Sequence, residues 1–90
     1  MLSYPSTNIL VSPLDDKAIK CLNEIETYLE INGTPYHQNS DNPNRIETHY
    51  FMGNSVVRIN KFKKKADIKI VSSKEDLLLG MKKSIETMLR

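Results

Sequence analysis

Three consecutive segments that alternate between apolar and polar residues, joined by very short connections, constrain the fold of this chain most. They are RIETHYFM at 45–52, SVVRINKF at 55–62 and ADIKIVS at 66–72. Alternation with a period of two is typical of a strand with one buried face. Connections as short as Gly53–Asn54 and Lys63–Lys65 can join only antiparallel neighbours. The sequence therefore predicts an antiparallel meander.

The segment before the meander has the pattern of an amphipathic helix over about 13–31. Ser12 can cap its start, Pro13 suits the first helical position, and Asp15 and Asp16 favour the positive end of the helix dipole. Gly33 is a natural stop. The apolar residues at helical spacing are Leu14, Ala18, Cys21, Leu22, Ile25 and Leu29.

A second helix is expected after residue 72, where SSKEDLLLGMKKSIETMLR follows the last strand. Ser72 or Ser73 is the expected cap, with Glu75 or Asp76 completing a capping box. Gly80 within this helix costs about 1 kcal/mol relative to alanine, so we expect it to mark a close crossing against the sheet or the other helix. The buried stripe is Leu78, Met81, Ile85, Met88 and Leu89, helped by Leu77.

A short strand in TNILVS, residues 7–12, completes the order β-α-β-β-β-α. We predict an α+β fold in a single compact domain over 1–90, with a four-stranded antiparallel sheet and both helices packed on one face. Residues 32–45 are rich in Asn, Gly, Pro and Ser, and we expect a long polar loop there. Part of it, near Pro35 to Gln38, could add to a sheet edge.

The charge of the chain is unevenly distributed. Residues 1–45 carry three basic and six acidic groups, a balance of −3, whereas residues 46–90 carry ten and five, a balance of +5. Five lysines lie between Lys61 and Lys69. An anionic partner would relieve their mutual repulsion; the alternative is a solvated turn that protects a sheet edge. The candidate binding residues are Arg58, Lys61, Lys63, Lys64, Lys65, Lys69, Phe51 and Phe62.

Two of these residues, Phe51 and Phe62, are aromatic and are expected on the uncovered sheet face beside Arg58 and Lys69. Exposed aromatic rings there could stack on single-stranded bases, or pack against another protein chain or a dimer mate. A bulge could instead turn either ring inward. The sequence leaves these three alternatives open.

Residue types with catalytic or metal-binding potential are sparse. No glycine-rich phosphate loop or nucleophile motif is present, and Cys21 lies on the apolar side of the first helix. We therefore expect no enzyme activity, no metal and no cofactor. A single cysteine excludes an intrachain disulfide and favours a reducing, cytoplasmic location. No apolar run is long enough for a transmembrane span.

The pattern of elements resembles the kinase-associated C-terminal domain of microtubule-affinity-regulating and AMP-activated kinases. The resemblance rests on Ser12-Pro13 leading into a long helix, on the meander, and on Lys69, Ser72 and Ser73 running into the final helix. Where that family often has a glycine, Ser73 stands here. The resemblance implies a non-catalytic regulatory module that binds acidic phospholipid, or docks on a kinase or another partner protein, through the basic residues.

Two further readings remain. Without the first strand, the order is similar to double-stranded RNA-binding domains, although Glu75 and Asp76 follow Lys74 where that family expects further basic charge. The third reading is a small stand-alone protein that inhibits a partner by blocking it.

Overall fold

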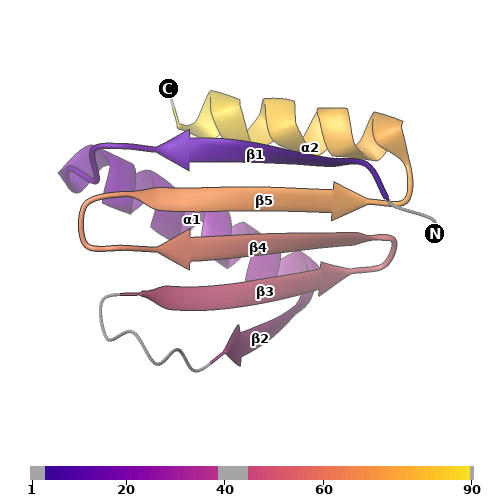
Figure 1. Ribbon diagram of the computed structural model, residues 1–90, viewed down its shortest axis with the longest axis horizontal. Helices are drawn as coiled ribbons and strands as arrows, with labels where there is room; N and C mark the ends of the chain where they lie inside the picture. Colours follow the sequence, from indigo (N-terminus) through magenta and orange to yellow (C-terminus); the bar gives the residue numbers. More distant parts are fainter. Residues whose placement is uncertain (1–3, 39–44, 90) are drawn as a thin grey trace.

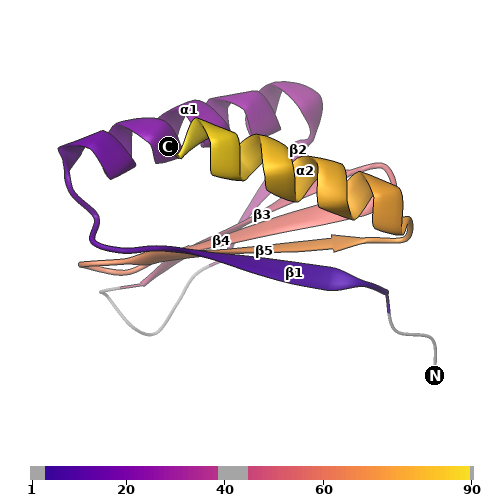
Figure 2. The ribbon, with the colours of Figure 1, turned by 90° about the horizontal axis from the view of Figure 1, so that it is seen from above.

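A helix layer and a sheet layer form the protein in a computed structural model, which describes residues 4–38 and 45–89. Both helices cover the same face of the sheet, and the other face is uncovered (Figures 1 and 2). The elements are β1 (Ser6–Val11), α1 (Asp16–Asn32), β2 (Thr34–Gln38), β3 (Ile46–Met52), β4 (Ser55–Lys61), β5 (Ala66–Ser72) and α2 (Glu75–Met88). The predicted α+β class and the antiparallel sheet are confirmed.

The sheet has five strands in the order β1-β5-β4-β3-β2, so the prediction of four strands was wrong. The additional strand, β2, lies within the segment expected to be a polar loop, and Thr34 pairs with Phe51 of β3. The expected addition of residues near Pro35 to a sheet edge is confirmed. Proline is tolerated there because an edge strand leaves half of its backbone groups unpaired. Residues 39–44 of the predicted loop lie outside the described part.

The meander is confirmed, with β3 paired to β4 and β4 to β5, both antiparallel. Gly53 has a φ of 53°, which the tight turn between β3 and β4 requires and which glycine adopts without steric cost. Strand β1 pairs with the other side of β5 and forms the second edge of the sheet. The tight turns between β3, β4 and β5 fix which residues of these three strands lie opposite each other.

Both helix starts differ from the prediction. Helix α1 begins at Asp16, and the carboxylate of Asp15 caps it by accepting a hydrogen bond from the backbone N–H of Ala18 at 2.8 Å. Helix α2 has Lys74 at its N-cap without a side-chain cap. Ser72 is buried, and its hydroxyl accepts a hydrogen bond from the Ser55 hydroxyl at 3.0 Å and another from the backbone N–H of Lys74 at 3.2 Å. The serine that the sequence suggested as the helix cap therefore joins the ends of β4 and β5 and bonds the residue before α2.

The core lies between the helix layer and the inner face of the sheet. It consists of Ile9, Val11, Leu22, Ile25, Leu29, Tyr50, Val57, Ile59, Ala66, Ile68, Ile70, Leu78 and Ile85. Gly80 does not mark a close crossing, because a side-chain carbon added there would meet no atom within 4 Å. The only aromatic ring of this core is Tyr50, whose hydroxyl lies 3.3 Å from Oε1 of Glu26 on α1.

Candidate functional site

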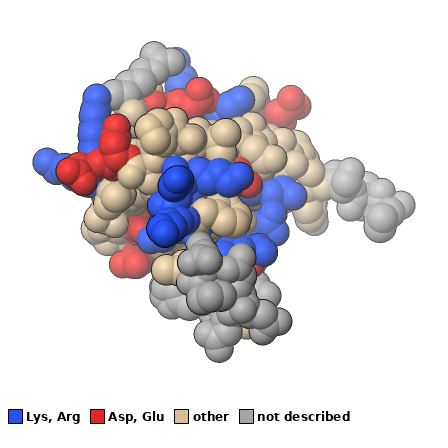
Figure 3. Space-filling model, turned by 60° about the vertical axis from the view of Figure 1, so that its left-hand side comes forward, with Lys and Arg blue, Asp and Glu red and all other residues tan. Residues whose placement is uncertain are grey.

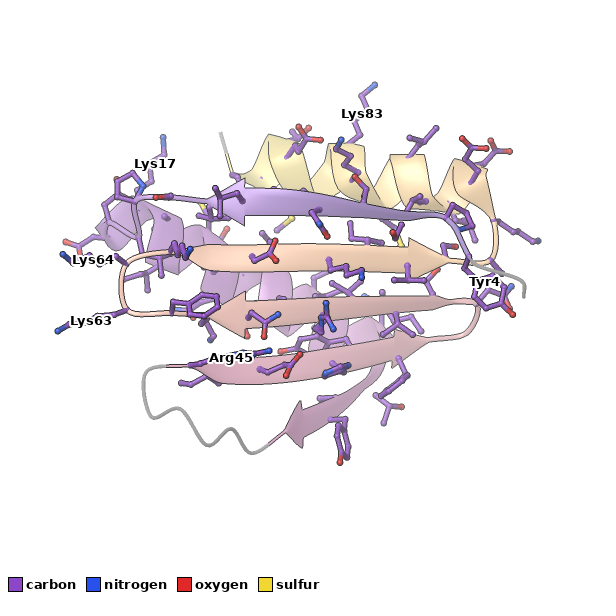
Figure 4. All side chains as sticks on the ribbon, in the orientation of Figure 1. Tyr4, Lys17, Arg45, Lys63, Lys64 and Lys83 are labelled. Carbon is purple, nitrogen blue, oxygen red and sulfur yellow. The ribbon has the colours of Figure 1, made fainter. Side chains whose placement is uncertain are left out.

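The uncovered face of the sheet displays its side chains in rows that run across the strands. Residues directly opposite each other on neighbouring strands form a row, as the register requires. Figure 4 looks onto this face. From the β4–β5 hairpin inward, the acidic row holds Leu10, Asp67, Asn60 and Glu47, the cationic row holds Asn8, Lys69, Arg58 and His49, and the apolar row holds Ser6, Val71, Val56 and Phe51.

Glu47 is the buried centre of a charge network in the acidic row. Only 8% of the residue is exposed. Its carboxylate lies 3.2 Å from a guanidinium nitrogen of Arg45, 3.6 Å from Nε of Arg58 and 3.3 Å from Nε2 of His49. Arg45 also donates a hydrogen bond to the side chain of Asn60 at 3.2 Å. A buried carboxylate needs such partners because it has lost its hydration, so this network is first of all structural.

The cationic row places like charges directly opposite each other. Lys69 of β5 faces Arg58 of β4, which faces His49 of β3. Arg58 has Glu47 nearby, whereas Lys69 has no ion pair with any side chain in the described ranges. Like charges opposite each other on a sheet are destabilising. The register confirms the predicted outward positions of Arg58 and Lys69. An anionic neighbour would reduce the repulsion within this row.

The aromatic side chains on this face are partly exposed. Phe51 is 48% exposed, which confirms its predicted outward position. Its ring stacks on His49 with centroids 6.3 Å apart, and Tyr36 of β2 meets His49 edge-on at the same distance. Tyr36 lies in the segment that was expected to be mainly loop with a possible addition to a sheet edge, and its ring was not among the predicted site residues.

The β4–β5 hairpin carries the second group of candidate residues. Lys63, Lys64 and Lys65 are exposed, and none is within ion-pair distance of a carboxylate among residues 4–38 and 45–89. Phe62 is half-buried, and the Lys65 ammonium lies 5.4 Å from its ring centroid. The ring is thus partly occupied by the chain's own lysine, which leaves a smaller surface for a partner than the sequence suggested.

Basic side chains from two elements gather at the hairpin end of the molecule. Lys17, in the first turn of α1, lies at the same end as Lys63 and Lys64 (Figure 4). In the view from this end, blue side chains occupy the middle of the surface (Figure 3). We call Lys17, Lys63, Lys64 and Lys65 the basic end. It has an open hollow lined by Ser12, Phe62 and the three hairpin lysines, and a second hollow is lined in part by Asp15 and Lys17.

Lys61 does not belong to the basic end. Its ammonium lies 2.9 Å from Oε2 of Glu26 on α1, on the side of the sheet that the helices cover. The prediction grouped it with the other lysines by sequence proximity. The alternation along β4 places it on the opposite face from Arg58. A lysine paired with the chain's own carboxylate is a poor candidate for partner binding.

An apolar groove of about 440 Å³ separates the two helices. Its walls come from Ile25, Tyr28 and Leu29 of α1 and from Leu77, Gly80, Met81, Ile85 and Met88 of α2. This groove was not predicted, because the apolar stripes of both helices were expected to be fully covered. The helices contact each other little, and Gly80 leaves the groove open at its centre.

In the described ranges, no three His, Cys, Asp or Glu side chains come together where they could share a metal ion. Cys21 is half-buried on α1. In the same ranges no helix combines the length and the apolar character that a membrane span requires.

Comparison of the chain with protein-family models, with curated proteins and with solved structures gives no match. The likeness to the kinase-associated domain therefore remains an expectation from the pattern of elements.

Proposed function

We propose that this chain is a non-catalytic regulatory module that binds an acidic phospholipid surface through its basic end. The observation that carries the proposal is the state of Lys63, Lys64 and Lys65, which are exposed and have no carboxylate partner within the described ranges. Their mutual repulsion gives the folded chain no advantage. Contact with negative charge turns that cost into attraction.

The shape of the basic end supports an extended anionic surface over a small anion. A small anion is usually held in a concave site with converging donors. Lys63 and Lys64 project outward from the hairpin at the same end as Lys17 (Figure 4), and the hollows at this end are open to solvent. A lysine near an acidic membrane surface contributes about 1 kcal/mol, so four lysines at one end would give weak, salt-sensitive binding.

Vesicle co-sedimentation tests the proposal with a matched pair of variants. We expect the protein to sediment with vesicles of phosphatidylserine and phosphatidylcholine at low salt, and not with phosphatidylcholine alone. The triple variant Lys63→Glu, Lys64→Glu, Lys65→Glu should lose this binding. The control variant Lys74→Glu, Lys82→Glu, Lys83→Glu changes the net charge equally but leaves the hairpin intact, and Lys83 lies on α2 away from it (Figure 4).

Two results would overturn the proposal. One is the absence of binding to acidic vesicles at low salt, and the other is an equal loss in both triple variants, which would indicate attraction by net charge alone. The wild type could instead give a salt-dependent mobility shift with nucleic acid that the hairpin variant loses. That result would favour nucleic-acid binding through the same lysines. Capture of an acidic protein that depends on the same three lysines would favour the docking or inhibitor reading.

A further inference from the structure

The charge pattern of the uncovered sheet face is the feature that the proposed function leaves unused. The acidic and cationic rows lie next to each other, two residues apart along the strands, which corresponds to about 7 Å. Asp67 and Lys69 are the members of these rows on β5, and both are partly exposed. Within the described ranges, neither takes part in an ion pair.

Apolar side chains border the charged rows and are also incompletely covered. Leu10 is 66% exposed at one end of the acidic row, and Phe51 is 48% exposed in the apolar row. Val56 and Val71 lie in the same apolar row as Phe51 and are partly exposed. A sheet face with apolar residues and unpaired charges of both signs is better matched by a protein surface than by bare solvent.

Symmetry selects the arrangement of a second copy on this face. Two sheets that pack face to face with their strands aligned can be related by a two-fold axis in the interface, either parallel or perpendicular to the strands. The parallel axis places each row on the same row of the other copy, so like charges meet. The perpendicular axis, between the two charged rows, places the acidic row of each copy on the cationic row of the other.

We propose that the uncovered sheet face binds a second copy of this chain about such a perpendicular two-fold axis. Asp67 of each copy then faces Lys69 of the other, and the contact occurs twice. Asn60 faces Arg58 in the same way, because both lie on β4 in the corresponding rows. The dimer would give Lys69 the anionic neighbour that its own chain does not supply.

The size of the face sets the strength of this dimer. Four strand spacings of about 4.8 Å and a strand length of about 20 Å give roughly 400 Å² per copy, or about 800 Å² in total. Stable interfaces bury about 1,200–2,000 Å². The dimer is therefore weak and reversible, with a dissociation constant in the micromolar range or above. The charged contacts that define it come from Asp67, Lys69 and Arg58, none of which belongs to the basic end, so it can be tested separately from the proposed vesicle binding.

Other occupants of this face fit the pattern less well. A nucleic-acid strand would find cations in one row, but the partly exposed carboxylate of Asp67 in the next row would repel its phosphates. A basic partner would meet Arg58 and Lys69 with the same difficulty. Only a partner that carries both signs in the matching order satisfies both rows, and a second copy does so by symmetry.

Sedimentation equilibrium at low salt, up to millimolar protein, tests the proposal with charge-exchanged variants. We expect the wild type to dimerise reversibly, and each single variant, Asp67→Lys or Lys69→Asp, to be monomeric because like charges then meet across the axis. An equimolar mixture of the two single variants should dimerise again, since each lysine faces an aspartate. The double variant Asp67→Lys, Lys69→Asp should also dimerise by itself.

Circular dichroism of each variant verifies that both single variants fold, and restored association in the mixture shows it directly. The variant Lys63→Glu is the control outside the interface and should dimerise like the wild type. A wild type that stays monomeric over the whole range would overturn the proposal. So would single variants that still dimerise, or a mixture that stays monomeric, because either result would mean that Asp67 and Lys69 do not meet across a two-fold axis.

Discussion

The ammonium group of Lys61 lies 2.9 Å from Oε2 of Glu26, and this pair joins β4 to α1. The Glu26 side chain is 13% exposed and that of Lys61 is 30% exposed, so water screens their attraction only in part. The other carboxylate oxygen of Glu26 accepts a hydrogen bond from the Tyr50 hydroxyl at 3.3 Å. One carboxylate thus connects the helix to two strands of the sheet.

Replacing Lys61 with methionine should destabilise the fold without affecting vesicle binding. The variant leaves a half-satisfied carboxylate, so we expect a loss of about 1–2 kcal/mol in the free energy of unfolding. Urea denaturation measures this loss. Combining Lys61→Met with Glu26→Gln should give a coupling energy of about 0.5–3 kcal/mol in a double-mutant cycle. Vesicle binding that disappears in a folded Lys61→Met variant would show that Lys61 is exposed to partners after all.

Glu47 gives a second stability prediction, on the uncovered face. The variant Glu47→Gln keeps the shape of the side chain but removes the negative charge that Arg45 and Arg58 share and that His49 contacts. We expect a loss of about 1–3 kcal/mol, because the cations are then left close together without a carboxylate. Asp67→Asn is the matched control: it has no ion pair in the described ranges, and its effect should stay within about 0.5 kcal/mol. Equal effects in both variants would contradict a structural role for the Glu47 network.

Local sequence rules predicted much of this fold because its connections are short. The turn at Gly53 and the three-lysine hairpin left only an antiparallel meander, and the turn lengths also fix that Arg58 faces Lys69. The segment that contains β2 was predicted as a long polar loop because it is rich in Asn, Gly, Pro and Ser, with only a possible addition of residues near Pro35 to Gln38 to a sheet edge. The connection from β2 to β3 is longer than the tight turns of the meander, so the sequence did not specify the register of this pair.

The candidate site was predicted in part for the same reason. Alternation along β4 places Arg58 outward, and it also places Lys61 inward, but the grouping of lysines by proximity in the sequence overrode that pattern. The partner of Lys61 is Glu26, thirty-five residues away, and only the packing of α1 brings the two together. Charge clusters in a sequence therefore need to be divided between the faces of a strand before they are interpreted.

Two glycines should respond in opposite directions to alanine. In Gly80→Ala the new methyl group meets no atom within 4 Å, and alanine is the better helix former, so we expect a gain of about 0.5–1 kcal/mol. In Gly33→Ala the new carbon would lie 2.9 Å from the backbone oxygen of Phe51 and 2.5 Å from Cγ of Met52. We expect that variant to lose stability, by about 1–3 kcal/mol, as overpacking does. Thermal unfolding compares the two, and a destabilised Gly80→Ala would mean that the groove between the helices is closed in solution.

The Tyr50 hydroxyl predicts how stability depends on pH at the alkaline end. Burial raises the pKa of this phenol well above its usual value, and the charges of Glu26 and Glu30 raise it further. The folded state therefore keeps the proton longer than the unfolded state, whose tyrosine has a pKa of about 10. The stabilisation linked to this proton is fully present below about pH 10 and is lost as the pH rises toward the folded-state pKa.

Two measurements check this behaviour. In the folded protein, tyrosinate absorbance should show that one of the four tyrosines titrates only at higher pH than the others or on unfolding. In Tyr50→Phe, urea denaturation should show a shallower fall in unfolding free energy above about pH 10 than in the wild type, because one proton-linked group is gone. Tyr28→Phe is the control for removing a phenol hydroxyl from the surface, since Tyr28 is 58% exposed. A late-titrating tyrosine that persists in Tyr50→Phe would mean that another phenol is the buried one.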